Sequence, residues 1–282
     1  AISGTDPTKS DSKSKFTDPD LDVDLKLGAV AGYNGEAVRS VHLKFLRRKG
    51  VIKSFSLSGK IGRDTPLTGE LRHRGHELGR DLIFLDTKDA GAFFRFSNIY
   101  SKMVGGQLEL AMDPPTADSS PKEGLMNVRN FSVKGEPALD RLVAGGADGP
   151  KKTVSFWRLR AEFTRQSGKL TVNEGVVKGP TVGATIEGSI DYVANKVRMS
   201  GTFVPLYGLN NMFGQIPVLG LFLGGGSDEG LIGITYEVIG SPAAPVVRIN
   251  PISAMAPGVL RKIFQFNTGK PQQNQFELPP DH

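Results

Sequence analysis

The chain has 282 residues, of which 38% are hydrophobic and 23% charged, and its formal net charge is +6. A chain of this length and composition can bury a substantial core as one large domain or two small ones. It contains no cysteine, which excludes a disulfide framework, a cysteine-ligated zinc site and a cysteine nucleophile. The mild basic excess permits contact with anionic lipid headgroups or nucleic acid and requires neither.

Residues 1–20 are small and polar, and they lack the apolar segment of a signal peptide. We interpret them as a disordered linker. Because the chain begins in a linker and without an initiator methionine, we expect it to be a fragment of a longer protein, with any anchor or targeting signal upstream.

The body of the chain shows the two-residue period of half-buried strands. From Leu21 to Leu27, apolar residues alternate with Asp22, Asp24 and Lys26, and similar alternation recurs up to Val238. A phase slip occurs at Trp157. Turn signals at Asn34-Gly35, Arg47–Gly50 and Ser167-Gly168 separate the runs. Further runs that predict strands begin at Val41, Phe55, Val154, Val182, Val197 and Ile232.

Helical spacing is rare. Residues 89–104 predict an amphipathic helix with Asp89 as N-cap, and residues 136–144 predict a second, short helix. Residues 113–123 are predicted to form a loop, and residues 267–282 a flexible tail.

The stretch between Arg198 and Asp228 has no charged side chain. Its apolar residues follow one helical face from Leu206 until Pro217, but asparagines, glycines and this proline interrupt it too often for a membrane-spanning helix. A helix–turn hairpin that lines or plugs an apolar cavity and an ordinary core helix remain alternatives. A further amphipathic helix, divided at Pro257, is predicted to begin after Asn250-Pro251 and reach Phe264.

These patterns predict a mainly β fold: a long curved antiparallel sheet forming an open trough or barrel-like groove, with a few short amphipathic helices near the C-terminus. The β-rich module is expected to span residues 21–266, with sub-lobes 21–148 and 149–266.

The sequence has few motifs that indicate catalysis or metal binding. His73 and His76 lie in an arginine-rich run without a third metal ligand, and they fit an exposed hairpin better than a metal site. The sequence contains no nucleophile elbow, zinc-protease motif or dinucleotide-binding loop before a helix. We therefore expect no enzymatic activity, no metal and no cofactor. The basic runs lack interleaved aromatic residues, so we expect no nucleic-acid partner.

Residues 201–264 resemble the C-terminal region of AsmA-like proteins, particularly the YhdP-like branch of the Gram-negative envelope. The resemblance rests on Gly201-Thr202 with Pro205, Ile216-Pro217 with Leu219-Gly220, Gly240-Ser241-Pro242, and Asn250-Pro251 with Ala256-Pro257-Gly258. Looser similarity covers most of residues 21–266.

This resemblance implies the C-terminal module of a longer, inner-membrane-anchored protein of the periplasm. Such proteins form a β-sheet trough with an apolar inner face, and they are implicated in bridge-like phospholipid transfer to the outer membrane and in envelope integrity. The implied partners are phospholipid acyl chains, the outer-membrane side of the envelope and other envelope proteins. The family has no catalytic residues to carry over.

The predicted function is therefore lipid binding and transfer, and the alternative is a scaffold that docks partners during outer-membrane assembly and has no lipid conduit. The residues predicted to contact lipid are Val182, Ile186, Ile190, Met199, Phe203, Leu206, Leu209, Met212, Phe213, Ile216, Leu219, Leu221 and Phe222.

Overall fold

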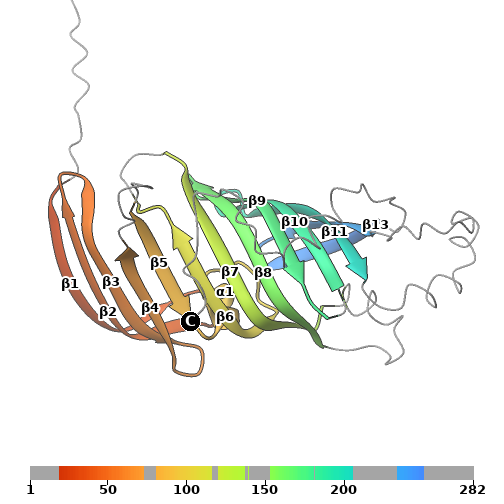
Figure 1. The fold of residues 1–282 in the computed structure, drawn as a ribbon, viewed down its shortest axis with the longest axis horizontal. Helices are drawn as coiled ribbons and strands as arrows, with labels where there is room; N and C mark the ends of the chain where they lie inside the picture. The colour runs from red at the N-terminus through yellow and green to blue at the C-terminus, as the bar shows by residue number, and fades with distance from the viewer. Residues whose placement is uncertain are drawn as a thin grey trace, which may run out of the picture.

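The computed structural model describes residues 19–72, 81–115, 120–136, 139, 153–180, 182–205 and 234–250. These residues form one antiparallel sheet of 13 strands, in which each strand pairs with its neighbours in sequence, and one short helix (Figure 1). The predicted mainly β, antiparallel fold is confirmed. The predicted helices near the C-terminus, and almost all of the one over 136–144, lie outside the described residues.

The elements in chain order are β1 (Leu21–Ala31), β2 (Ala37–Arg48), β3 (Val51–Ile61), β4 (Thr65–Arg72), β5 (Leu82–Thr87), α1 (Ala90–Phe96), β6 (Met103–Met112), β7 (Lys122–Lys134), β8 (Thr153–Gln166), β9 (Lys169–Lys178), β10 (Val182–Asp191), β11 (Lys196–Pro205), β12 (Ile234–Ser241) and β13 (Ala244–Asn250). The edge strands β1 and β13 do not pair with each other, so the described sheet is open. The strands β7 and β8, on either side of the suggested sub-lobe boundary, are adjacent in this one sheet.

Tight turns join several of the hairpins. In Asn34-Gly35, Lys49-Gly50 and Ser167-Gly168 both residues have positive φ, as the favoured two-residue hairpin turns require. The turn signals of the sequence are therefore confirmed at these places.

One face of the sheet is apolar, because residues paired across strands share a face and the apolar residues fall into cross-strand rows. We call this the apolar face and its reverse the polar face. One row is continuous in register from β3 to β12: Gly59, Leu67, Thr87, Leu108, Val128, Leu159, Val177, Ala184, Phe203 and Ile234.

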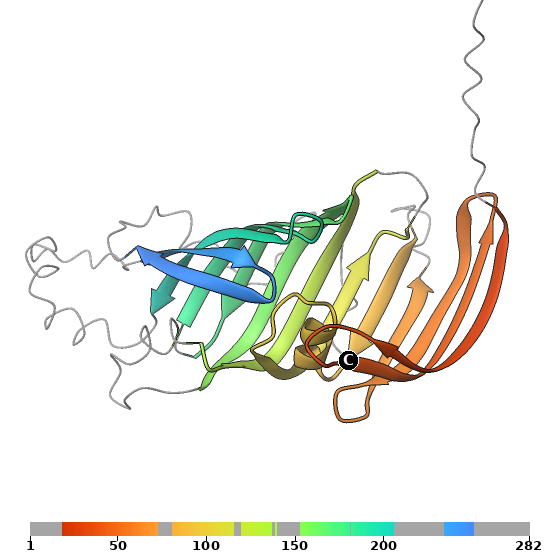
Figure 2. The ribbon, with the colours of Figure 1, turned by 180° about the vertical axis from the view of Figure 1, so that it is seen from behind.

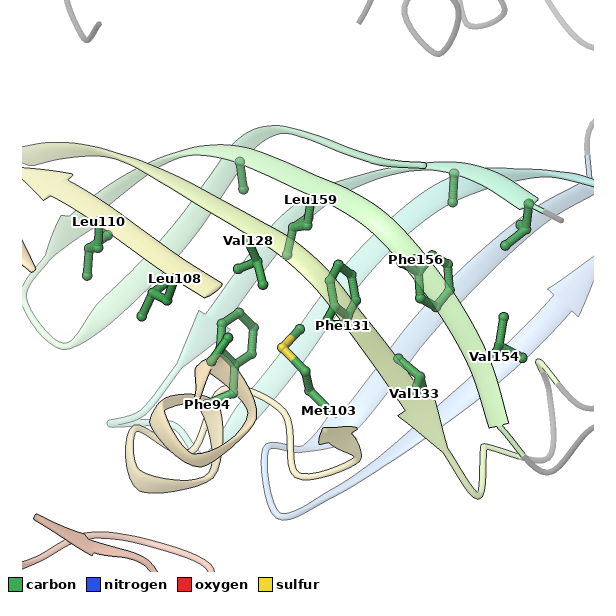
Figure 3. Packing of buried hydrophobic residues seen from close by; sticks show 14 of the residues in the cluster. Phe94, Met103, Leu108, Leu110, Val128, Phe131, Val133, Val154, Phe156 and Leu159 are labelled. Carbon is green, nitrogen blue, oxygen red and sulfur yellow. The ribbon is translucent and has the colours of Figure 1, made fainter. Parts of the chain in front are cut away.

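An irregularity in β7 and β8 keeps large side chains on this face. Asn130 has a φ of 53°, which interrupts the alternation of β7. Val128 and Phe131, three residues apart, therefore both point to the apolar face. Phe131 stacks on Phe156, with ring centroids 5.1 Å apart (Figure 3). The exposed Trp157 marks the same shift on β8, which confirms the predicted phase slip.

The helix α1 is shorter than predicted. Asp89 is its N-cap and accepts a hydrogen bond from the Ala92 amide at 3.0 Å, as predicted. The helix ends at Phe96, however, and Met103 already begins β6. Asn98 adopts a positive φ of 52° that an α-helix cannot accommodate. The apolar spacing up to Met103 therefore reports burial in the core, and not a continuous helix.

Helix α1 lies on the apolar face and buries the middle of that face. Phe94 points into the sheet among Leu108, Val128 and Met103 (Figure 3). Ala92 and Phe96 pack against the ends of β2, β3 and β4 at Val38, Val41, Ile61 and Leu67. A Cβ on Gly91 would lie 2.5 Å from the Met103 carbonyl oxygen, so a glycine is needed where the helix touches β6.

The C-terminal carbonyls of α1 accept hydrogen bonds from turns that lie far apart in the sheet. Such carbonyls have no partner within the helix. The Asn34 amide donates to Arg95 O at 3.0 Å, and the Tyr33 backbone N–H donates to Phe96 O at 3.1 Å. The Tyr192 hydroxyl, from the β10–β11 turn, makes a long contact of 3.5 Å with Ser97 O.

The turns that reach α1 lie far apart in the strand order of the sheet. Neighbouring strands of a sheet rotate relative to each other in a constant sense, so a sheet of many strands does not stay flat. The β1–β2 turn and the β10–β11 turn nevertheless both reach the C-terminal end of α1. Figures 1 and 2 show a curved sheet, bent most strongly at β1–β3, with α1 and the β12–β13 hairpin on the side seen in Figure 2.

Coverage of the apolar face decreases toward β1. Leu108 and Val128 are fully buried, whereas Leu25 and Leu27 are each 43% exposed. We call the part of the apolar face nearest β1 the open strip: Leu21, Val23, Leu25 and Leu27 on β1, Leu43 and Phe45 on β2, and Phe55 and Leu57 on β3. Leu21 is also exposed, and the other residues of the open strip are half-buried.

This gradient makes a prediction about stability. Leu108→Ala removes a side chain packed beneath α1, and we expect it to lower the free energy of unfolding by about 2–5 kcal/mol. Leu25→Ala, on the same face, is expected to cost at most about 1 kcal/mol because the side chain is already largely in water. Urea unfolding of both variants measures the difference. Equal, small losses would contradict a packed centre.

Candidate functional site

The predicted lipid-contacting residues that the structure describes all lie on the apolar face. Val182, Ile186 and Ile190 belong to β10, and Met199 and Phe203 belong to β11. Val182, Ile190 and Phe203 are at most 3% exposed, and the other two are half-buried. The remaining predicted residues lie outside the described part of the chain: Leu206, Leu209, Met212, Phe213, Ile216, Leu219, Leu221 and Phe222.

The register brings these β10 and β11 residues next to apolar residues of the flanking strands. Phe203 lies opposite Ala184 on one side and Ile234 on the other. Met199 lies between Gly188 and Val238 in the same way. The predicted residues therefore continue the apolar face toward β12 and β13.

A tyrosine on β12 ties this part of the sheet together. Tyr236 lies opposite Gly201, and its hydroxyl crosses that glycine to donate a 2.8 Å hydrogen bond to Thr185 O on β10. A Cβ on Gly201 would lie 2.8 Å from this hydroxyl. Burial raises the pKa of Tyr236, so the hydroxyl keeps its proton and stays a donor. Sequence analysis missed this contact, because nothing in the alternation shows which glycine lets a side chain pass.

A second buried tyrosine lies between α1 and β6. The Tyr100 hydroxyl donates to Glu136 at 3.2 Å, and Lys102 pairs with the same carboxylate at 2.9 Å. Burial and the Glu136 charge raise the pKa of Tyr100. The Tyr100 hydroxyl, the Lys102 ammonium group and the Glu136 carboxylate therefore satisfy one another within the fold.

The open strip is the part of the apolar face that sequence analysis did not select. The alternation from Leu21 to Leu27 predicted its strand correctly. Its exposure depends on two facts that the local pattern does not contain: β1 is an edge strand, and α1 packs on β6, β7 and only one end of β2–β4. Together they leave these leucines accessible to solvent.

The polar face carries charged networks that hold neighbouring strands together. Glu109 accepts two 2.8 Å contacts from the Arg129 guanidinium and a longer one from Asn127. The Asn127 side-chain oxygen in turn accepts from Arg158 at 2.9 Å. This face also has a small apolar cluster, over which the Arg72 guanidinium lies 3.6 Å from the Phe84 ring centroid; the cluster comprises Leu82, Phe84, Ala111 and Leu125.

In the part of the chain that the structure describes, no group of three or more His, Cys, Asp or Glu side chains is placed to hold a metal ion. His42 lies on the polar face, with its Nε2 atom 2.6 Å from Asp24. His73 and His76 fall outside the described residues. Within the described ranges, no helix has the length and apolar character needed to cross a membrane.

Comparisons of the chain with protein-family models, with curated proteins and with solved structures find no match. The similarity to the AsmA-like family therefore stays a prediction, and the case for a function rests on the geometry of the sheet.

The polar face generates a prediction about pH. Burial, followed by the charge of the cross-strand residue Glu109, raises the pKa of Asp86. The folded state then holds this proton more tightly than the unfolded state, so Asp86 favours folding below its unfolded pKa of 3.8 and loses this contribution as pH rises through its folded pKa. We expect Asp86→Asn to raise stability near neutral pH and to have little effect at about pH 3.5.

Asp24→Asn is the matched control on the same face. The hydrogen bond with His42 lowers the pKa of Asp24, so this carboxylate favours folding above its unfolded pKa and the contribution is lost on acidification. The variant should therefore lose stability near neutral pH. Denaturant unfolding at the two pH values measures both effects, and a destabilised Asp86→Asn variant near neutral pH would contradict the assignment.

Proposed function

We propose that the chain is a non-enzymatic lipid-binding and lipid-transfer module of the periplasm. In this proposal it forms the C-terminal part of a longer, inner-membrane-anchored bridge that carries phospholipids between the inner and outer membranes. The observation that carries the proposal is the apolar face, whose cross-strand rows run through almost the whole sheet and become accessible at the open strip.

The energetic requirement favours such a surface. Sheltering an acyl chain from water contributes about 0.8 kcal/mol per methylene, or on the order of 12 kcal/mol for roughly 16 carbons. Scattered surface leucines cannot supply this. Adjacent strands about 4.8 Å apart place apolar side chains side by side, and the bend of the sheet would shape them into a groove (Figure 2).

In this proposal the open strip is where an acyl chain first makes contact, and the β10–β11 residues lie further along the same face. Helix α1 covers β6 and β7 between them, so a passing acyl chain has to run beside the helix or displace it. The uncharged segment that includes Phe213 and Phe222 is proposed to cap, gate or membrane-dock the groove.

A scaffold without a lipid conduit is the second candidate, and one observation favours it. The centre of the apolar face is packed around α1, where Ala90, Phe94 and Met103 are almost completely buried. A docking domain for envelope assembly needs only this dry core and an exposed surface. In either case we propose no catalytic activity and no nucleic-acid partner.

Lipid extraction with variants of β1 separates the two candidates. The purified chain is exposed to envelope phospholipids, and mass spectrometry quantifies the lipid that remains bound. We expect Leu25→Asp to lower bound lipid by about tenfold, because it places a charge in the open strip. Since Leu25 lies on an edge strand and is already exposed, the fold should persist.

Gly28→Asp is the matched control, because it adds the same charge to the same strand. Gly28 alternates with Leu27 onto the polar face, and a Cβ there meets nothing within 4 Å. This variant should retain lipid. If the unmodified chain holds no lipid, or if both variants hold as much as it does, the transfer proposal fails and the scaffold remains.

A further inference from the structure

The described sheet has a free edge at β1. This strand pairs with β2 on one side only, at one end of the sheet (Figure 1). None of its 11 residues is buried, and all except Val23 and Val30 are exposed. An edge strand of this length presents a row of backbone N–H and C=O groups that can pair with another strand.

β1 lacks the features that usually prevent such pairing. Natural edge strands are short, contain proline or a bulge, or point charged side chains toward the buried face. The segment Leu21–Ala31 contains no proline and no residue with a positive φ, and its positions on the apolar face carry only leucine, valine and alanine. The opposite edge, β13, has seven residues and includes Pro245, which has no N–H to donate. Of the two edges, β1 is therefore better suited to accept a further strand.

The hydrogen-bond pattern of β1 indicates which backbone groups face the free edge. Along an antiparallel strand, residues alternate between bonding to a given neighbour and pointing away from it. Gly32 donates its backbone N–H to Glu36 O at 2.9 Å, in line with the register of β1 and β2. Counting back from Gly32 in steps of two, the even-numbered residues bond toward β2. The odd-numbered residues therefore turn their N–H and C=O groups to the free edge: Leu21, Val23, Leu25, Leu27 and Ala29.

The charges of β1 are complementary to those of a second copy of the same strand. In an antiparallel pair with its two-fold axis at Leu25, Asp24 lies opposite Lys26 of the second copy, and Lys26 lies opposite Asp24 of the second copy. Moving the axis by one residue, to Asp24 or to Lys26, would place two aspartates or two lysines opposite each other, which destabilises a strand pair. Lys26 is exposed, and the Asp24 side chain is 56% exposed although it also contacts His42. Both charges are thus accessible to a second strand.

The same register also satisfies the backbone and the apolar face. Outward-facing residues then lie opposite outward-facing residues, as an antiparallel ladder requires. Leu25 lies opposite Leu25 of the second copy, and Val23 lies opposite Leu27, so the two open strips would form one continuous strip. A two-fold contact of this kind is closed, whereas pairing of β1 with the β13 edge of another copy would continue from copy to copy as a ring or a filament.

We propose that β1 pairs antiparallel with β1 of a second copy of this chain, in the register that places Leu25 at the two-fold axis. The pairing joins the two sheets into one and leaves both apolar faces on the same side. This inference goes beyond the proposed lipid-binding function and does not depend on it, because it rests on the backbone and the charges of the sheet edge.

Sedimentation equilibrium of the full 282-residue chain tests the proposal. We expect a dimer at about 100 μM that dissociates on dilution to about 1 μM, since a single strand pair is a small interface. Lys26→Asp places like charges opposite each other at both ends of the central pair, and it should raise the dimer dissociation constant about tenfold. Lys60→Asp is the matched control, because it makes the same charge change at an exposed position of β3, and it should leave the dissociation constant unchanged.

Two further variants test the register and the backbone pairing. Asp24→Lys alone should weaken the dimer as Lys26→Asp does. An equimolar mixture of these two variants should form a heterodimer more readily than either forms a homodimer, because one copy then carries two acidic residues opposite two basic residues of the other. Leu25→Pro removes an outward N–H that β2 does not use, so it should abolish the dimer while β1 stays in its own sheet.

Each outcome supports or overturns the inference. A chain that stays monomeric at the higher concentration overturns it, and so does a dimer that Lys26→Asp leaves intact, which would have to form away from this edge. Equal weakening by Lys60→Asp also overturns it, because the charge effect would then not be local to β1. If the mixture associates no better than the separate variants, the register is wrong. Should Leu25→Pro or Asp24→Lys fail to fold, Lys26→Asp with its control still decides, and none of these results bears on whether the chain extracts lipid.

Discussion

The apolar face is much wider than the helix that covers it. Alternation places hydrophobic side chains on one side of strands from β1 to β13, and within the described residues a single helix, Ala90–Phe96, packs on that side. Seven helical residues cannot cover so large a surface. Residues of β10 and β11 such as Val182 and Phe203 are also buried, whereas the strip nearest β1 stays exposed. The distribution of burial, and with it each functional proposal, follows from this mismatch in area.

The same distribution explains why two functions remain in competition. A closed centre around Phe94 is what a scaffold needs, whereas accessible leucines on β1 are what a lipid needs. Contiguous exposed apolar surface commonly marks a binding site when it is large. On the polar face, the Glu109 and Arg129 pair joins neighbouring strands through its charges.

Much of the fold could be predicted from local sequence. Alternation from Leu21 to Leu27, the Asn34-Gly35 turn and the shift at Trp157 each follow from rules that act over a few residues. The length of α1 could not, because Ile99 and Tyr100 keep helical spacing while they pack as parts of a turn. Contacts between segments far apart in the chain, such as Tyr192 with Ser97, have no local signature either. The exposure of Leu25 depends on what lies at the sheet edge, which no single strand encodes.

The order of the strands also bears on how the chain reaches this state. Every hydrogen-bonded partner in the sheet is the preceding or following strand in sequence, so most pairings close over short distances along the chain. Topologies dominated by such local contacts fold faster than those that join remote segments. The bonds from Tyr33 and Tyr192 to the end of α1 span much longer distances along the chain, and they can form only after the meander has coiled. We therefore expect neighbouring strands to pair first and the long-range contacts with the end of α1 to form last.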